Sequence, residues 1–223
     1  MRFCRKVMAI TGKDTISEIR TKEIIPPVLV FALLVIVIFN FAFEPGRATM
    51  ALVAPGILWA TFAFAGVLSL NRSFVMEKED GCLEGLMMCP VGREVIYTGK
   101  MLGSLLFMLI IEAIALPVFA LLFNLPVFSA ELIVVTVLAT VGFAAVGTLF
   151  SALAANAKAR EMVLPVLFFP VVIPVIVSAV KASGLALSGE SWSSMASWLG
   201  IIGAFDVVFI VVSFLVFAYV IEE

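Results

Sequence analysis

The stretch Ile24-Ile-Pro-Pro-Val-Leu-Val-Phe-Ala-Leu-Leu-Val-Ile-Val-Ile-Phe-Asn-Phe-Ala-Phe43 decides the fold of this chain. It contains no charged residue, and Asn40 is its only polar side chain. A helix of about 20 apolar residues spans the ~30 Å hydrocarbon core of a bilayer. A helix pairs its backbone polar groups within one segment, and the run lacks the alternating polarity of a barrel strand. We therefore predict a transmembrane helix over residues 24–43.

Five further runs of this kind follow, so the chain is predicted to cross the membrane six times. Their approximate bounds are 50–70, 98–123, 131–154, 162–180 and 199–221. The composition agrees, because 63% of the 223 residues are hydrophobic and only 13% are charged, too few to cover a soluble domain. We expect an all-α integral membrane protein with a single membrane domain over residues 1–223.

Lys and Arg residues concentrate on one side of the predicted spans. Of the fourteen such residues, only Arg47 and Lys181 fall in connections on the opposite side. Short loops rich in Lys and Arg stay in the cytoplasm, so both chain ends are predicted to be cytoplasmic. The longest connection on the opposite side is expected over residues 181–198, with Trp192 and Trp198 as anchors at the membrane interface.

Residues 1–22 mix basic and apolar residues at helical spacing. The apolar residues are Phe3, Val7, Met8, Ile10, Ile16 and Ile19. This pattern predicts an amphipathic helix at the cytoplasmic interface, with a frayed basic arm that only sets the topology as the alternative. We expect Gly12 to divide the helix in two. In the fifth span, Pro165, Pro170 and Pro174 predict a kinked or broken helix.

The loop over residues 71–97 holds the densest charge cluster of the chain. It contains a segment of about two turns, too short to be stable alone in water. Asp80 can cap its start, Glu84 suits its first turn, and Pro90 ends it. Its apolar stripe consists of Leu83, Leu86 and Met87. The segment therefore docks on a cytosolic partner, or it folds against the ends of its own helices; the pattern alone permits both.

The same loop resembles a known family of transporters. Its run Glu77-Lys-Glu-Asp-Gly-x-Leu-Glu-x-Leu-x-x-x-Pro90, followed by Gly99-Lys100, resembles the membrane subunits of type-2 ABC exporters. In that family the loop is a coupling helix that seats in a groove of the ATPase subunit. The resemblance implies ATPase-contact residues, namely Glu77, Glu79, Asp80, Gly81, Leu83, Glu84, Leu86, Met87 and Pro90.

Two further motifs narrow the resemblance to CcmB, the haem exporter protein B of cytochrome c maturation. They are Asp14-x-x-x-Glu18-x-Arg-Thr-Lys-Glu23 and Ala54-Pro-Gly-Ile-Leu-Trp59, the latter followed by Phe64-Ala-Gly-Val-Leu-Ser-Leu-Asn-Arg-Ser-Phe74. The resemblance covers most of residues 14–125. It implies a bacterial inner-membrane subunit present in two copies with two copies of the ATPase CcmA. Further implied partners are CcmC, CcmD and the haem chaperone CcmE, with haem as the cargo.

Two acids lie inside predicted spans, Glu112 in the third and Asp206 in the sixth. A charged side chain at this depth of the bilayer is energetically costly. Each acid therefore belongs to a translocation path or a proton-sensitive switch, or it forms a hydrogen bond between helices. Gly99-x-x-x-Gly103 would let two helices pack closely, for instance in a dimer. The chain contains no histidine and no Gly-x-x-x-x-Gly-Lys-[Ser/Thr] loop, so ATP and Mg²⁺ are expected on the partner subunit.

We predict no catalytic residue, no metal or cofactor site, and no nucleic-acid surface in this chain. Three alternatives stand beside the transport subunit. One is an exporter subunit for a lipid, drug or polysaccharide. The second is a scaffold of the cytochrome c assembly complex that transports nothing. The third is an intramembrane enzyme built on Glu112 and Asp206, which lack any supporting motif.

Overall fold

The computed structural model describes residues 2–43, 47–79, 81–155 and 160–222. Within these ranges it contains eight helices, six of which are long and apolar enough to cross a membrane. The helices are α1 (Arg2–Thr21), α2 (Ile25–Ala42), α3 (Arg47–Glu79), α4 (Cys82–Met88), α5 (Arg93–Phe123), α6 (Ala130–Ala155), α7 (Arg160–Leu187) and α8 (Trp192–Glu222). The predicted all-α membrane fold with six spans is confirmed.

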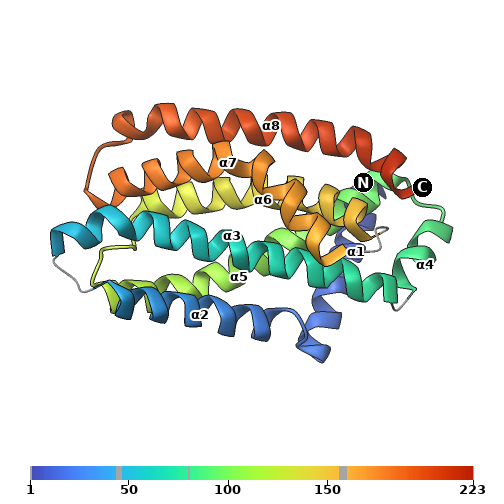
Figure 1. Ribbon diagram of the computed structural model, residues 1–223. Coiled ribbons are helices and arrows are strands. Elements are labelled where there is room, and N and C mark those ends of the chain that lie inside the picture. Colours follow the sequence, from blue (N-terminus) through green and yellow to red (C-terminus); the bar gives the residue numbers. More distant parts are fainter. Residues whose placement is uncertain (1, 44–46, 80, 156–159, 223) are drawn as a thin grey trace.

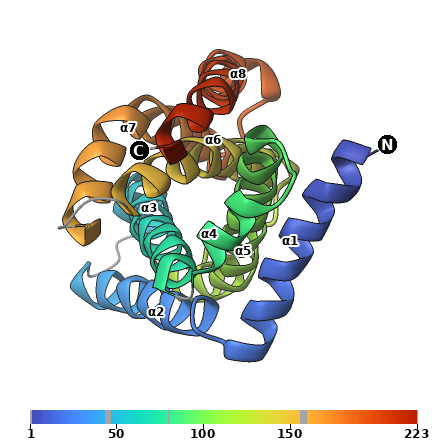
Figure 2. The same cartoon turned by 90° about the vertical axis from the view of Figure 1, so that its right-hand side faces the viewer.

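The six spanning helices run side by side, and the short helix α4 lies at one end of the bundle (Figure 1). The N- and C-termini lie at this same end, which we call the α4 end; the opposite end is the far end. Figure 2 looks onto the α4 end and shows α1 crossing the outside of the bundle beside α5. An even number of spans explains why both termini lie at one end.

Helix α6 forms the centre of the bundle. It packs against α3, α5, α7 and α8, and 72% of its spanning window is buried, against 17% for α2. The difference reflects side-chain size. Helix α6 carries many small residues, among them Ala139, Ala144 and Ala145, which are fully buried. Without a hydrophobic force between helices in lipid, small side chains allow the close packing that holds them together.

Several predicted boundaries were wrong because they ended helices too early. Helix α3 continues past residue 70 as far as Glu79, with Phe74 buried in a cluster at the α4 end. Helix α1 continues through Gly12 as a single helix. A glycine costs a helix only about 1 kcal/mol relative to alanine, and packing of α1 on α5 outweighs that cost.

The predicted long connection over residues 181–198 is also wrong, since only residues 188–191 lie outside α7 and α8. The Ser- and Gly-rich sequence resembled a loop, but Ser183 within it is buried against a neighbouring helix. The Ser183 hydroxyl accepts a hydrogen bond of 2.8 Å from the indole N–H of Trp59 on α3. Helix α7 is likewise unbroken despite its three prolines, a sequence feature that membrane helices tolerate.

Candidate functional site

The candidate site is the α4 end, where the helix predicted to meet a partner is found. Helix α4 has seven residues and makes its main helix contact with the end of α3. Its N-cap is Gly81, with φ of 65° and no side-chain hydrogen bond. Gly81, rather than Asp80, therefore occupies the N-cap position, where the left-handed backbone favours glycine. Asp80 itself lies outside the described residues.

The described side chains of α4 divide into an inner and an outer set. Leu86 is half-buried and packs against the buried cluster of its own chain at the α4 end. Met88 is 88% exposed, and Pro90 is exposed as well. Of the predicted contact residues, Leu86 thus faces inward and Pro90 outward. The side chains of Glu77, Glu79, Leu83, Glu84 and Met87 lie outside the described residues.

Sequence reasoning missed Met88 as a surface residue. The predicted stripe followed the helical spacing of leucines, whereas Met88 lies at the last position of the helix and outside that stripe. Its place directly before the turn to Pro90 was the available signal. An exposed methionine at a helix end is a flexible apolar contact of the kind that adaptable protein surfaces use. Cys82 and Cys89 are also exposed beside it.

Helix α1 holds the α4 end together from the side. The Lys6 ammonium donates to the carbonyl oxygen of Pro90 at 3.0 Å, which ties α1 to the turn between α4 and α5. The Thr11 hydroxyl donates to the carbonyl oxygen of Gly99 at 2.9 Å. A Cβ atom on Gly99 would lie 2.8 Å from the Cβ of Ile10, so only glycine permits this approach. The Gly99-x-x-x-Gly103 spacing therefore serves α1 within one chain.

A buried ion pair joins the same two helices. The Lys100 ammonium on α5 lies 2.8 Å from a carboxylate oxygen of Asp14 on α1, and the two side chains are 1% and 7% exposed. Lys13, on the outer side, lies 3.2 Å from the other carboxylate oxygen. Breaking a buried pair is far costlier than breaking a surface pair, because the remaining charge stays out of water. The pair therefore fixes how α1 sits on α5.

The second buried acid of α1, Glu18, begins the first spanning helix. Its carboxylate accepts the backbone N–H groups of Ile24 at 3.1 Å and Ile25 at 2.7 Å. Pro26 and Pro27 follow and have no N–H to satisfy. Glu18 thus pairs the donors that the start of α2 leaves open, and its charge suits the positive end of the helix dipole.

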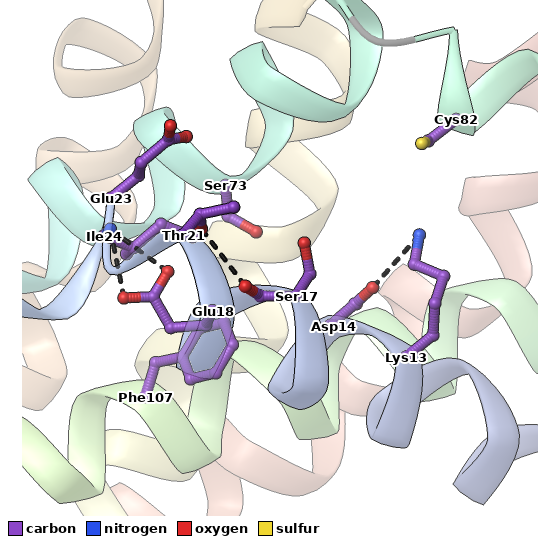
Figure 3. A pocket seen from close by; sticks show the side chains of 10 residues that line it. All are labelled: Lys13, Asp14, Ser17, Glu18, Thr21, Glu23, Ile24, Ser73, Cys82 and Phe107. Carbon is purple, nitrogen blue, oxygen red and sulfur yellow. Dashed lines mark hydrogen bonds and ion pairs between the residues drawn. The ribbon is translucent and has the colours of Figure 1, made fainter.

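A cleft of about 210 Å³ lies between α1 and the helices α3, α4 and α5 (Figure 3). Most of the residues that line it are polar or charged, among them Lys13, Asp14, Ser17, Glu18 and Glu23 from α1 and the turn after it. Cys82 of α4 and Ser73 of α3 stand on the opposite side. The cleft thus separates α1 from α4, and any movement of α4 toward α1 would narrow it.

The two intramembrane acids lie outside this cleft, and they differ in their hydrogen bonding. Glu112 on α5 is 4% exposed and accepts a hydrogen bond from the Thr140 hydroxyl on α6, with oxygen distances of 2.8 and 2.9 Å. This is the predicted hydrogen bond between helices. Asp206 on α8 is 5% exposed and approaches Gly142 of α6, and neither of its carboxylate oxygens has a hydrogen-bond partner among the described residues.

The sequence as a whole decides the family. The family whose description reads "CcmB protein" matches residues 5–223. The chain belongs to the CcmB family. The match confirms the predicted resemblance and extends it across the C-terminal half, where the quoted motifs were sparse.

Curated relatives of this CcmB-family chain carry the name heme exporter protein B. The one from Rhodobacter capsulatus is 32% identical over 165 residues, which cover 71% of this chain and 76% of the relative. The one from Bradyrhizobium diazoefficiens is 32% identical over 162 residues, with 72% and 73% covered. The one from Pseudomonas aeruginosa is 28% identical over 181 residues, with 81% of each covered.

The structure gives physical roles to the motifs by which the CcmB family was recognised. Asp14 and Lys100 come from separate motifs and form the buried pair, while Glu18 starts α2. Trp59 fastens α3 to α7 through Ser183. In the described part of the chain, no group of three or more His, Cys, Asp or Glu side chains could hold a metal ion. The motif residues of this CcmB-family chain thus position helices, Asp14, Glu18 and Lys100 beside α1 and Trp59 in the half of the bundle nearer the far end.

Proposed function

We propose that this chain is the membrane subunit of an ATP-driven transporter that acts in cytochrome c maturation. A separate ATPase of the CcmA type would hydrolyse ATP, and this subunit would couple that hydrolysis to haem export or to release of the haem-loaded chaperone. Membership of the CcmB family and the names of the relatives support the proposal. Haem is treated as cargo, and ATP and Mg²⁺ belong to the partner.

The observation that carries the proposal is the exposed helix α4. Seven residues cannot form a stable helix alone in water, yet α4 projects from the end of the bundle with Met88 open to solvent. Docking into a groove of another protein would stabilise the helix and cover Met88. We propose that the ATPase subunit provides this groove, in an assembly with two copies of each subunit.

The proposed coupling uses the rigid connections around α4. Helix α3 runs without a break from the far end to Glu79, and α5 begins at Arg93 and runs back across the bundle. A force applied to α4 would therefore reach both spans. Lys6 holds the turn at Pro90, and the Arg93 guanidinium donates to the carbonyl oxygen of Ala218 on α8 at 3.1 Å. These contacts would carry the movement to α1 and α8.

The proposed location is the bacterial inner membrane, with α4 and both termini in the cytoplasm. The proposed neighbours are CcmC and CcmD in the membrane and the haem chaperone CcmE. The native thiols Cys82 and Cys89 are exposed and report the orientation. A membrane-impermeant maleimide should modify them in inside-out vesicles and leave them unmodified in right-side-out vesicles. Modification from the periplasmic side alone would contradict the proposal.

A second experiment tests the ATPase contact. The chain is co-expressed with its ATPase, and the amount of ATPase that co-purifies in detergent is measured. Met88→Glu places a charge on the docking surface and should reduce ATPase retention about tenfold, equivalent to ~1.4 kcal/mol. Met88→Leu is the matched control and should retain it. Equal retention in both variants would show that α4 does not bind the ATPase through this face.

Cytochrome c assembly distinguishes transport from the scaffold alternative. An ATPase that binds but cannot hydrolyse ATP should abolish cytochrome c assembly if this chain couples hydrolysis to work. Under the scaffold alternative, the assembled complex suffices and cytochromes continue to form. The readout is haem staining of c-type cytochromes, with retention of the inactive ATPase checked by co-purification.

A further inference from the structure

A groove of about 270 Å³ lies between α5 and α6, away from the α4 end. Its walls are mainly apolar, formed on α5 by Leu109, Ala113, Leu116 and Pro117, and on α6 and the linker before it by Val127, Phe128, Ile133 and Val137. Glu112 lies eleven residues before Phe123, about 16 Å from the end of α5 at 1.5 Å per residue. The groove therefore runs from mid-depth toward the far end.

The groove contains two polar side chains in an otherwise apolar lining. Glu112 and Thr136 line it and are 4% and 3% exposed. The Thr136 hydroxyl has no hydrogen-bond partner among the described residues. The Thr140 hydroxyl lies 2.8 Å from Glu112 but also 2.7 Å from the carbonyl oxygen of Thr136, so its one proton is shared between the two acceptors. The groove therefore retains unused hydrogen-bonding capacity at its base.

Lipid tails cannot use this capacity, because hydrocarbon carries no donor or acceptor. A buried polar group without a partner costs several kcal/mol in such surroundings, which favours an occupant that brings a donor. The volume is also below the range of about 300–1,000 Å³ of small-molecule sites, so a few side chains fit it better than an enclosed macrocycle.

A second copy of this chain fits the groove poorly. A two-fold contact brings the same surface patch of each copy together. Here it would bring Glu112 of both copies into one interface, with no Lys, Arg or His among the residues lining the groove to compensate. A different helix, with an N–H or O–H donor at this depth, is complementary to the acid and the hydroxyl.

We infer that the α5–α6 groove receives a spanning helix of a different membrane subunit of the same assembly. That helix places apolar side chains against the walls and a donor side chain against Glu112 and Thr136. This inference rests on the proposed function, which supplies a membrane partner of the CcmC or CcmD kind. It also separates the two contacts: the ATPase binds at the α4 end, and the membrane partner binds between α5 and α6.

Co-purification of the whole assembly tests the inference. Ala113 is exposed in the groove, so Ala113→Trp fills it, whereas Ile114, 42% exposed on the same helix, does not line the groove. Ala113→Trp should reduce retention of the membrane partner about tenfold while the ATPase remains bound. Ile114→Trp, the matched control, should retain both. Unchanged retention of the membrane partner in Ala113→Trp would overturn the inference.

A crosslinking experiment avoids any variant that fails to fold. A photoreactive phenylalanine derivative replaces Val137, which is 40% exposed and lines the groove. Illumination should join this position to the membrane partner. Adducts only with lipid, or only with a second copy of the chain, would overturn the inference. If the wild-type chain never retains an ATPase, the proposed function fails, and that result is separate from the crosslink to the membrane partner.

Discussion

The buried acids of α1 and those of the membrane interior are held in opposite ways. At the α4 end, Asp14 has Lys100 within 2.8 Å and Glu18 accepts two backbone N–H groups. In the interior, Glu112 has one shared hydroxyl, and Asp206 has no hydrogen-bond partner among the described residues. The comparison teaches that burial alone does not define a role. A fully paired acid fixes the packing of its helix, whereas an incompletely paired acid keeps hydrogen-bonding capacity for a further partner.

Removing Asp14 should have the largest effect on stability. Asp14→Leu leaves the Lys100 ammonium buried without this partner, and breaking a buried pair costs about 3–5 kcal/mol. Unfolding of the detergent-solubilised protein, followed by circular dichroism, measures the loss. The double variant Asp14→Leu/Lys100→Met removes both charges and should recover most of the stability. If the double variant is as unstable as the single one, the ion pair does not account for the effect.

The second-largest loss of stability is expected when the cap of α2 is removed. Glu18→Ala leaves the N–H groups of Ile24 and Ile25 without their acceptor, and we expect a loss of about 2–3 kcal/mol in the free energy of unfolding. Glu18→Gln keeps an acceptor oxygen and should lose less. The same unfolding assay compares the two variants. Equal losses would mean that packing of the side chain, rather than the hydrogen bonds, is responsible.

The third-largest loss of stability is expected when the packing of α1 against Gly99 is disturbed. Gly99→Ala places a methyl group 2.8 Å from Ile10, so α1 must move outward, at about 1–2 kcal/mol. Gly12→Ala is the matched control, because a methyl group at Gly12 meets nothing within 4 Å. It should leave stability unchanged or raise it by about 1 kcal/mol through helix propensity. A loss at Gly12 equal to that at Gly99 would contradict the assigned contact.

The smallest effect is expected at Asp206. Asp206→Asn keeps the shape of the side chain and removes no hydrogen bond among the described residues, so stability should change by less than about 1 kcal/mol. Cytochrome c assembly is measured in the same variant. Lost assembly with unchanged stability would place Asp206 in the transport reaction. A large loss of stability would instead show a partner for this acid and remove the contrast with Asp14.

Hydropathy predicted the spans well because the length and apolar composition that a span needs are properties of its own segment. Each span needs about 20 apolar residues wherever it packs, so 24–43 was predicted against Ile25–Ala42 observed. Some helix ends were predicted poorly, as at residues 71–79 and 181–198. Those segments are helical through contacts with other helices, such as Trp59 with Ser183, that local composition does not report.

The candidate site was predicted in outline and corrected in detail. The short helix after Gly81 was expected, but the direction of Leu86 and the exposure of Met88 follow from how α4 packs on α3. Helical spacing identifies which residues share a face. It does not identify the neighbour on that face, so an apolar stripe predicts burial without distinguishing the protein's own core from a partner.

The sequence by itself determined the membrane as solvent, the number of spans and the family, since composition, segment length and motif identity are properties of the linear chain. Only the tertiary structure decided that Asp14 meets Lys100 and that Glu18 begins α2. Asp14 and Lys100 are 86 positions apart in the chain. A charge in a motif finds its partner only when helices pack, because ion pairs and hydrogen bonds act over a few ångströms in space, however far apart the residues stand in sequence.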